Sequence, residues 1–245
     1  MNEIMTKSLA QIVSNNHRAA SVFEKYHLDF CCKGKRTLQQ ACMEKDLKIE
    51  DVVADLKTSK QTSSDKNTVD PNQLTLAQLS DYIVMTHHSY VKKEMPQILA
   101  YLEKVASKHG DGHPELFKVF ELFAAVKEEM DLHMKKEEQV LFPRIQEMEK
   151  WVAEGTEIRI NHTYLQAPIN MMEQEHDHAG EMLAEINRLT HNYTPPPDAC
   201  TTYKLSFAAL QAFEMDLHQH VHLENNILFP KALQLFGVPD SYSLN

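Results

Sequence analysis

One eleven-residue pattern occurs twice in this chain and constrains the fold more than any other feature. Segments 133–143 and 220–230 both read His-x-x-x-Glu-x-x-x-Leu-Phe-Pro. In an α-helix, residues four apart lie on the same side, separated by about 6 Å along the axis. Two such helices facing each other would direct two imidazoles and two carboxylates to one interior point. The repeat therefore predicts helices that share a metal site, and its duplication suggests two metal ions.

Composition narrows the class of protein. The 245 residues include only 6 Gly, which favours helices over sheet, and the net charge of -10 argues against general nucleic-acid binding. No apolar run approaches the ~20 residues that span a bilayer, and the N-terminus lacks the apolar core of a secretion signal. We therefore expect a cytoplasmic protein without a membrane segment, in which the cysteines are thiols. These cysteines are Cys31, Cys32, Cys42 and Cys200.

The chain divides into three parts by composition. Residues 1–58 read as a small helical unit, in which helical apolar spacing is interrupted by the polar turn 29–35. Residues 58–67 contain no apolar side chain, so 59–73 are expected to form a flexible linker. Residues 74–245 are expected to form a second, larger domain.

Four long helical patterns fill this larger domain. Pro96 is expected to bend the first, whereas Pro143 and Pro230 are expected to kink or locally rewind the second and fourth. The connection 151–166 has no assigned role. The order of elements predicts an all-α fold, an antiparallel four-helix bundle. The patterns span 75–108, 114–150, 167–191 and 201–236.

The first and third helices of a duplicated helix pair should each add a ligand. His88 precedes His133 by 45 residues, and His176 precedes His220 by 44. His87 adjoins His88, and periodicity alone does not say which of the two points inward. The candidate metal ligands are His88, His133, Glu137, His176, His220 and Glu224.

The donor types indicate the metal. Imidazole and carboxylate ligands suit redox-active first-row metals, whereas structural zinc is usually bound by thiolates or by a single tetrahedral set of four ligands. Two bridging carboxylates would let two irons share charge and keep positions open for an oxo group, water, O₂ or NO. An isolated His–Glu pair would instead be a solvated helix pair, but the repeat favours a binuclear site.

Other polar residues flank these ligands. Glu129 lies one turn before His133, and Glu175 adjoins His176, so either could orient an imidazole or relay protons. His218 and His222 fall outside the helical face of the ligands, and surface positions are expected for them.

The bundle resembles a hemerythrin-like domain, and the whole chain resembles the repair-of-iron-centres (RIC) family of di-iron proteins. The segments that carry the resemblance are 133–143, 172–181, 194–202 and 220–230, and 28–38 resembles the family's ScdA-type N-terminal domain. The resemblance implies repair of iron–sulfur clusters damaged by nitric oxide or oxidants, at a μ-oxo and carboxylate-bridged pair of non-haem irons. It also implies that the six candidate residues are the ligands, with His88 in place of His87.

The same resemblance implies partners. These would be damaged iron–sulfur proteins, with NO or O₂ as small ligands; whether the chain forms a homodimer stays open. Two other functions fit the site: reduction of NO at a ferrous pair, and reversible O₂ or NO sensing of the hemerythrin type.

Cys31 and Cys32 are neighbours in the polar turn, so a disulfide between them would be strained. The positive charges at Lys33, Lys35 and Arg36 are expected to favour thiolate, and the polar surroundings to favour exposure. On a tethered domain the pair could handle iron or exchange thiols during repair; the alternative is packing in a helical core. Lys33 replaces a glycine of the family's motif, which leaves the backbone of the turn open.

The two other cysteines have no assigned chemistry. Cys42 lies in a helical pattern and is expected to pack in its core. Cys200 lies in a segment that matches the family and is expected to be structural.

Overall fold

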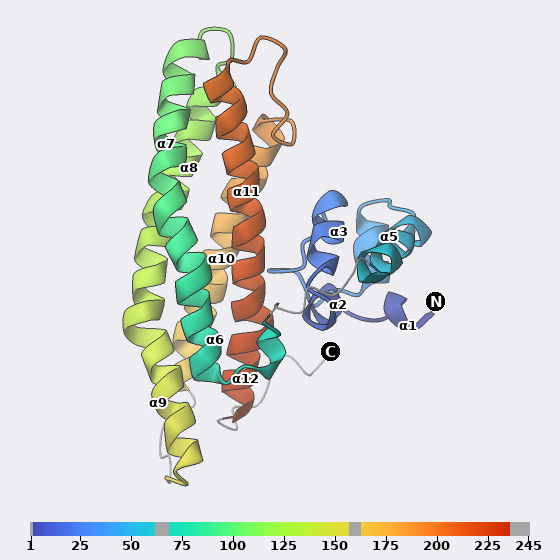
Figure 1. Ribbon diagram of the computed structural model, residues 1–245, viewed down its shortest axis with the longest axis vertical. Helices are drawn as coiled ribbons and strands as arrows, with labels where there is room; N and C mark the ends of the chain where they lie inside the picture. The colour runs from blue at the N-terminus through green and yellow to red at the C-terminus, as the bar shows by residue number, and fades with distance from the viewer. Residues whose placement is uncertain (1, 62–68, 157–162, 236–245) are drawn as a thin grey trace. The chain divides into compact units, whose positions relative to one another are not determined.

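The protein is described by a computed structural model that covers residues 2–61, 69–156 and 163–235. Regular structure in these ranges is helical, apart from one isolated bridge between Ser8 and Thr37 (Figure 1). The predicted all-α fold is therefore confirmed. Internal contacts define two units, Met1–Leu79 with His218–Asn245, and Ser80–Leu217.

Short helices of the N-terminal region begin at well-defined caps. The Ser8 hydroxyl accepts a hydrogen bond from the Gln11 backbone N–H, and the Gln11 side chain accepts one from the Ser8 backbone N–H. Thr37 and Gln40 form the same capping box at the start of the fourth helix. Each box satisfies backbone donors that a helix start leaves open. The helices are α1 Asn2–Met5, α2 Leu9–Asn15, α3 Ala19–Lys25, α4 Leu38–Glu44 and α5 Ile49–Gln61.

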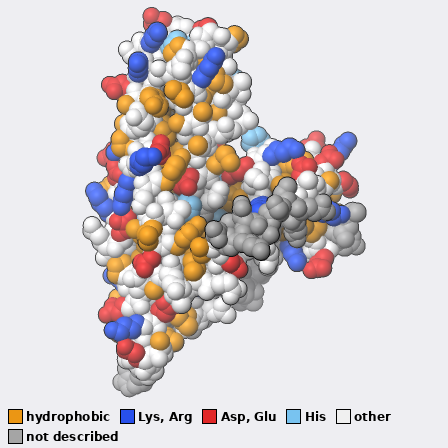
Figure 2. Space-filling view, in the orientation of Figure 1, with side chains coloured by type: hydrophobic (Ala, Val, Ile, Leu, Met, Phe, Trp, Pro, Cys, Tyr) orange, Lys and Arg blue, Asp and Glu red, His pale blue; other side chains and the backbone are white. Residues whose placement is uncertain are grey.

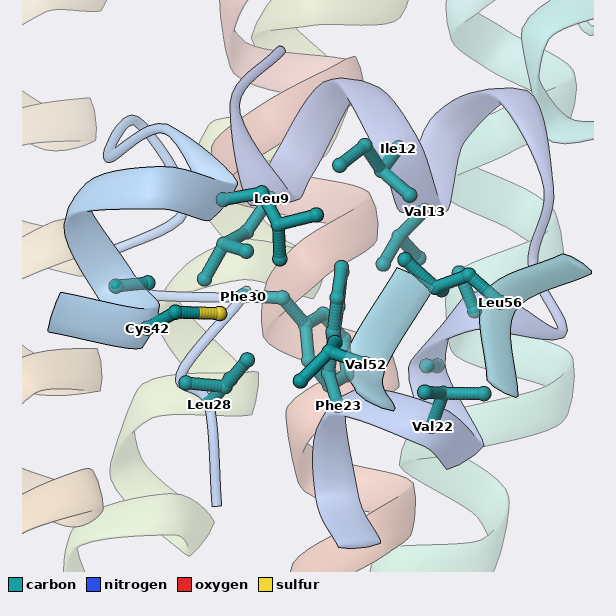
Figure 3. Packing of buried hydrophobic residues seen from close by; sticks show 14 of the residues in the cluster. Leu9, Ile12, Val13, Val22, Phe23, Leu28, Phe30, Cys42, Val52 and Leu56 are labelled. Atoms are coloured by element: carbon teal, nitrogen blue, oxygen red, sulfur yellow. The ribbon is translucent and has the colours of Figure 1, made fainter. Parts of the chain in front are cut away.

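These helices share one apolar core (Figure 3). The rings of Phe23 and Phe30 lie 6.2 Å apart at its centre, and both are almost fully buried. Removing these side chains from water is the main favourable contribution to folding of such a small unit. The labelled members are Leu9, Ile12, Val13, Val22, Phe23, Leu28, Phe30, Cys42, Val52 and Leu56.

Gly34 joins the polar turn 29–35, called the cysteine turn below, to α2. Its carbonyl accepts from the Ala10 backbone N–H at 2.9 Å, and a Cβ at Gly34 would lie 2.2 Å from the Phe30 carbonyl oxygen. Lys33, in contrast, is not among the residues with positive φ. The turn therefore tolerates the lysine at position 33, because the close backbone approach is at position 34.

The four predicted long helices are all present in the described residues. In Figure 1, α7, α8, α10 and α11 run alongside one another. Within unit Ser80–Leu217, the rings of Phe123 on α8 and Phe213 on α11 lie 5.2 Å apart at the bundle's centre. The elements are α6 Leu76–Ile83, α7 Ser89–His109, α8 Glu115–Lys136, α9 Phe142–Ala153, α10 Thr163–Leu189, α11 Thr201–Leu223 and α12 Phe229–Leu235.

Three π-helical turns interrupt this set: η2 Val84–His88, η3 Glu137–Leu141 and η4 Glu224–Leu228. The last two occupy the same place in the repeated pattern, just before Pro143 and Pro230. Proline lacks an N–H and its ring clashes with the carbonyl four residues earlier, so the regular α-helical hydrogen-bond pattern cannot continue through it. The predicted local rewinding is confirmed at both prolines. At Pro96, α7 continues through the proline.

Several sequence-based boundaries stay predictions. Helix α5 continues to Gln61, and residues 62–68 and 157–162 lie outside the described residues. The division into 1–58, 59–73 and 74–245 is therefore not tested, and connection 151–166 stays without an assigned role. A short 3₁₀ turn, η1 Pro71–Gln73, lies in the predicted linker.

No helix in the described ranges combines the length and apolar character needed to cross a membrane. On the face shown in Figure 2, acidic, basic and apolar side chains are interspersed over the long helices.

Candidate metal centre

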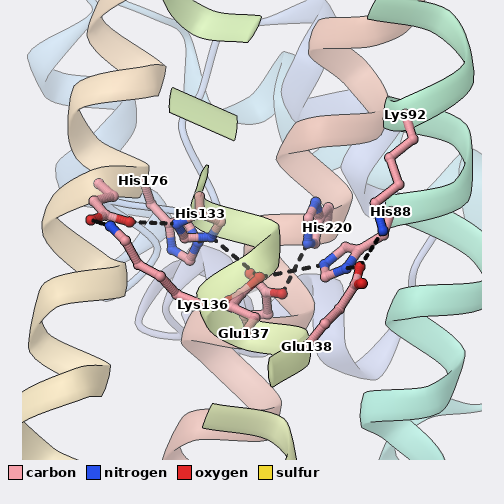
Figure 4. A network of polar contacts seen from close by, with 10 residues as sticks. His88, Lys92, His133, Lys136, Glu137, Glu138, His176 and His220 are labelled. Atoms are coloured by element: carbon pink, nitrogen blue, oxygen red, sulfur yellow. Dashed lines mark hydrogen bonds and ion pairs between the residues drawn. The ribbon is translucent and has the colours of Figure 1, made fainter. Parts of the chain in front are cut away.

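The inner face of the bundle brings predicted ligands together (Figure 4). Glu137 is the first residue of η3, one helical turn after His133, and its Oε2 lies 3.3 Å from His133 Nε2 and 3.4 Å from His88 Nε2. His176, from α10, places its Nε2 3.0 Å from His133 Nε2. All four side chains are at most 2% exposed. One carboxylate thus lies between imidazoles contributed by different helices.

The second copy of the pattern repeats the local arrangement. His220 Nε2 lies 2.9 Å from Glu224 Oε1, and both residues are fully buried. Two groups of possible ligand atoms each lie within 4.8 Å of one another, and both contain Glu137 and Glu224. The groups are His88, Glu137, His220 and Glu224, and His133, Glu137, His176 and Glu224. Two buried clusters that share two carboxylates are consistent with a di-metal site.

A second ring of charged residues orients two of the imidazoles. Glu138 Oε1 lies 2.7 Å from His88 Nδ1 and accepts from Lys92 Nζ at 2.6 Å. Burial opposes ionisation of Glu138, but the bonds from Lys92 and His88 outweigh it and lower the pKa of the carboxyl. The carboxylate is therefore held ionised next to His88.

The same arrangement recurs on His133. Glu175 Oε2 lies 2.9 Å from His133 Nδ1, and Lys136 donates to the other carboxylate oxygen. The hydrogen bond from His133 is the largest cause that lowers the pKa of Glu175 to about 2, against the opposing effect of burial. Each of these two imidazoles is thus anchored by a carboxylate–lysine pair.

These anchors decide which ring nitrogen is free to bind a metal. An ionised carboxylate only accepts, so Nδ1 of His88 and His133 carries a proton, and in the neutral form of each ring Nε2 presents its lone pair. In that form both lone pairs face Oε2 of Glu137, acceptor against acceptor. A cation between them would turn this repulsion into attraction. The donor set therefore fits a bound metal.

The spacing of the nitrogens agrees with this. Two nitrogens that bind one ion at right angles with bonds of about 2.1 Å lie about 3 Å apart. The Nε2 atoms of His133 and His176 are separated by 3.0 Å.

The structure distinguishes the adjacent histidines 87 and 88. His88 lies in the inner cluster, whereas His87 Nδ1 lies 3.0 Å from Asp216 Oδ1 on α11. Both rings are buried, and the ring of His87 also packs edge-on against Tyr82. Burial therefore does not show which of the two histidines is a candidate ligand, because both are buried. The direction of each side chain shows it.

The two predicted flanking carboxylates lie in different places. Glu175 contacts His133, whereas Glu129 places its Oε2 2.9 Å from Nδ1 of the exposed His178. Glu138 was not predicted, although it directly follows Glu137 in the repeat. Lys92 was not predicted either, although it lies one helical turn after His88, on the same face of α7.

A separate group of possible ligands lies in the N-terminal region. Atoms of Asp29, Cys31 and Cys32 lie within 4.8 Å of one another. Asp29 Oδ1 accepts from the backbone N–H of Cys31, Cys32 and Lys33 at 3.0–3.2 Å, and Cys31 Sγ lies 3.3 Å from the same oxygen. The two sulfurs are 3.8 Å apart. One carboxylate thus organises both cysteines.

The surroundings of Cys31 differ from the expectation. Its side chain is buried, and the hydrogen bond with Cys32, followed by burial and the nearby Asp29, raises the pKa of the thiol well above its usual value. The predicted positive environment is weakened because Arg36 is paired with Glu44. The expectation of an exposed thiolate at Cys31 is therefore wrong; Cys32 is half-buried.

His222 also differs from the expectation. It is 4% exposed, with its Nε2 3.4 Å from Ser14 Oγ and its ring 5.7 Å from Phe30. Burial lowers the pKa of His222 to about 4. The predicted surface position is wrong because residues from the N-terminal region cover this side of the helix, which a single helix's periodicity does not reveal. His218 is half-buried and its Nδ1 lies 2.7 Å from Glu24 Oε1.

Comparisons with known proteins agree with this architecture. Residues 79–232 match the hemerythrin HHE cation binding domain. The chain belongs to the hemerythrin family. Residues 5–60 match a second family model, ScdA_N, a domain of unknown function. The hemerythrin match contains all six residues of the two His/Glu clusters.

Relatives of this hemerythrin-family chain extend over nearly its whole length. Proteins named iron-sulfur cluster repair protein YtfE from Enterobacter sp. (strain 638), Escherichia coli O17:K52:H18 and Shigella boydii serotype 4 are each 36% identical over 225 residues. Each alignment covers 92% of this chain and 96% of the relative. The predicted membership of the RIC family is confirmed.

Proposed function

We propose that this protein repairs iron–sulfur clusters damaged by nitric oxide or oxidants, with two non-haem iron ions as its resident cofactor. The observation that carries the proposal is the pair of buried donor groups that share Glu137 and Glu224. Similarity to YtfE repair proteins over 92% of the chain supports the same function. The proposed ligands are His88, His133, Glu137, His176, His220 and Glu224.

The composition of the site suits iron that is loaded and released. Four neutral imidazoles and two carboxylates contribute a charge of -2, which offsets only part of the charge on two divalent ions. We expect such ions to be more labile than in an all-carboxylate site. When bound, the iron pair would supply releasable iron and open positions for small ligands.

The chain's own residues prepare this site. The Lys92–Glu138 and Lys136–Glu175 pairs fix the Nδ1 protons of His88 and His133, so Nε2 is ready to bind without first losing a proton. Burial of the six side chains keeps bulk water from competing for them. These residues orient ligands and hold protons at defined atoms.

The cysteine turn is proposed as a second participant. Asp29, Cys31 and Cys32 offer a carboxylate and two sulfurs within 4.8 Å, a mixed set of one hard and two soft donors that could hold iron in transit. Because the Cys31 thiol is protonated at neutral pH, binding there would have to displace a proton. This coupling would favour transient over permanent binding.

Metal content and repair activity together test the proposal. Purified protein should contain about two irons per chain, and a His133→Ala/His220→Ala variant should lose most of that iron. It should also fail to reactivate an NO-damaged [4Fe–4S] hydratase. A His178→Ala/His191→Ala variant removes two exposed histidines as the matched control and should retain both properties. Full iron retention after loss of His133 and His220 would contradict the ligand assignment.

Reduction of NO is the competing function, because two histidines and two shared carboxylates would leave open positions on each ion. Rapid mixing of the reduced, iron-loaded protein with NO would distinguish the two. Formation of N₂O at a catalytic rate would favour the reductase, whereas reactivation of the hydratase without N₂O favours repair by iron supply. A reversible, spectrally visible O₂ adduct would instead favour the sensor.

A further inference from the structure

A small cavity lies where the end of α7 meets the start of α11. Its volume is about 230 Å³, and all of its lining belongs to unit Ser80–Leu217. It lies about 30 Å along α7 from His88, because His109 follows His88 by 21 residues at 1.5 Å each. The cavity is therefore separate from the metal centre. It is lined by Lys104, Val105, Lys108, His109, Cys200, Thr201 and Thr202.

A nucleophile and a base face each other in this cavity. His109 Nε2 lies 3.3 Å from Cys200 Sγ, within reach for transfer of the thiol proton. The imidazole is held in place by the Tyr203 ring, whose centre lies 5.4 Å away. Tyr203 is itself buried, so the base is packed against a fixed surface.

The backbone adds to this arrangement. Cys200 immediately precedes α11, and the backbone N–H groups of Tyr203 and then Thr202 stabilise the sulfur, with a contribution from Lys108. Together they lower the pKa of the Cys200 thiol against the opposing effect of burial. Burial instead raises the pKa of Cys42. The features of a reactive thiol therefore meet at Cys200.

The charge of the lining indicates the reagent. Lys104 and Lys108 are exposed and lie one turn apart on α7, and both residues line the cavity. The two threonines add hydroxyl groups at the start of α11. A small molecule carrying carboxylates next to a reactive sulfur would match this lining.

We propose that Cys200 is a thiol-exchange site for small anionic disulfides, with His109 as its proton acceptor and Lys104 and Lys108 as its carboxylate-binding groups. Cys200 first passes its proton to His109. Its sulfur then attacks one sulfur of the disulfide, a new S–S bond forms, and the reagent's S–S bond breaks. The second half leaves as a thiolate, which can take the proton from His109. Cys200 is oxidised and the departing sulfur is reduced, so electrons and atoms balance.

The proposal does not depend on repair of iron–sulfur clusters. It assigns a reversible modification to the end of the bundle away from the metal centre. Its failure would leave the iron assignment untouched, since Cys200 is not among the proposed ligands.

The test uses the full iron-loaded chain and glutathione disulfide as the anionic probe, with bis(2-hydroxyethyl) disulfide as the neutral probe. Peptide mass spectrometry follows the mixed disulfide at each cysteine. We expect Cys200 to react with glutathione disulfide, and Lys104→Gln/Lys108→Gln to slow this reaction about tenfold at low salt. The neutral probe should be slowed much less, because for it the substitutions remove only the contribution of Lys108 to ionisation of the thiol. Lys118→Gln on α8 is the matched control and should change neither rate.

A His109→Gln variant separates the base from the lysines, because it should slow both probes. Thermal unfolding and iron content should match those of the parent chain in every variant. An unmodified Cys200 would overturn the proposal. Equal rates for the two probes, unaffected by the lysine substitutions, would also overturn it.

Discussion

Nδ1 of His133 lies 2.9 Å from Oε2 of Glu175, a residue 42 positions later on a different helix. The equivalent relationship on the other side of the site joins His88 to Glu138, 50 positions apart. In both cases a lysine neutralises the carboxylate. Packing of the bundle, and not local sequence, thus supplies the groups that orient the ligands.

Glu175→Gln should weaken metal binding. The amide can still accept from His133 but carries no charge, so the ring is held less firmly and is a poorer donor. We expect a loss of about 10- to 100-fold in iron affinity, measured by competition with a chelator. Glu129→Gln is the matched control, because Glu129 contacts the exposed His178. An unchanged affinity in Glu175→Gln would show that this contact does not tune the metal.

Replacing both cysteines of the turn should separate binding from repair. Cys31→Ala/Cys32→Ala leaves the six proposed ligands in place, so iron content should stay at that of the parent chain. Reactivation of a damaged cluster should be slower if the pair handles iron in transit. Cys42→Ala removes a buried thiol from the apolar core of the N-terminal region and should leave the reactivation rate unchanged. Normal reactivation without Cys31 and Cys32 would show that the pair is dispensable.

Gly34→Ala should destabilise the N-terminal region. The added Cβ would lie 2.2 Å from the Phe30 carbonyl oxygen, so the backbone of the cysteine turn must shift. Overpacking of this kind costs about 1–3 kcal/mol. Hydrogen exchange in the full chain would detect faster opening of 29–38 in this variant. Lys33→Ala is the control and should exchange like the parent chain, because the backbone at position 33 already carries a Cβ and has no positive φ.

His113 should make stability depend on pH at the far end of the bundle. Burial opposes its charge, but hydrogen bonds to Asp198 and then Glu115 outweigh this and raise the pKa of His113. A raised pKa in the folded state stabilises the protein below the unfolded value of about 6.5, and this contribution is lost as pH rises through the folded value. Thermal unfolding should therefore separate His113→Gln from the parent chain more at about pH 5.5 than at about pH 9. An equal difference at both values would mean that the ring does not titrate as described.

Much of the fold could be predicted because it rests on local rules. Helical periodicity gave the long helices, and the prolines of the repeat marked the π turns η3 and η4. Five of the six proposed ligands could be named from their spacing, since a helix converts a fixed interval into a fixed face, and the family resemblance added the choice of His88 over His87. Glu138 was not predicted by this reasoning, because a residue directly after a ligand normally points to another face.

Other features could not be predicted because they depend on contacts between distant segments. Cys31 was expected to be an exposed thiolate, yet burial and the contacts to Cys32 and Asp29 reverse that expectation. His222 was placed on the surface, but Phe30 and Ser14 cover it. The approach of His109 to Cys200 joins residues 91 positions apart and has no local signature.

The sequence by itself determined the all-α architecture and the duplicated ligand pattern, because these follow from periodicity and spacing along single helices. Its motif segments carried the resemblance to the RIC family. Only the tertiary structure decided which nitrogen of each anchored imidazole faces inward, which carboxylates hold the rings, and which cysteine meets a base. The physical reason is that burial and electrostatic partners are properties of packed neighbours, and packing brings together residues that no interval along the chain connects.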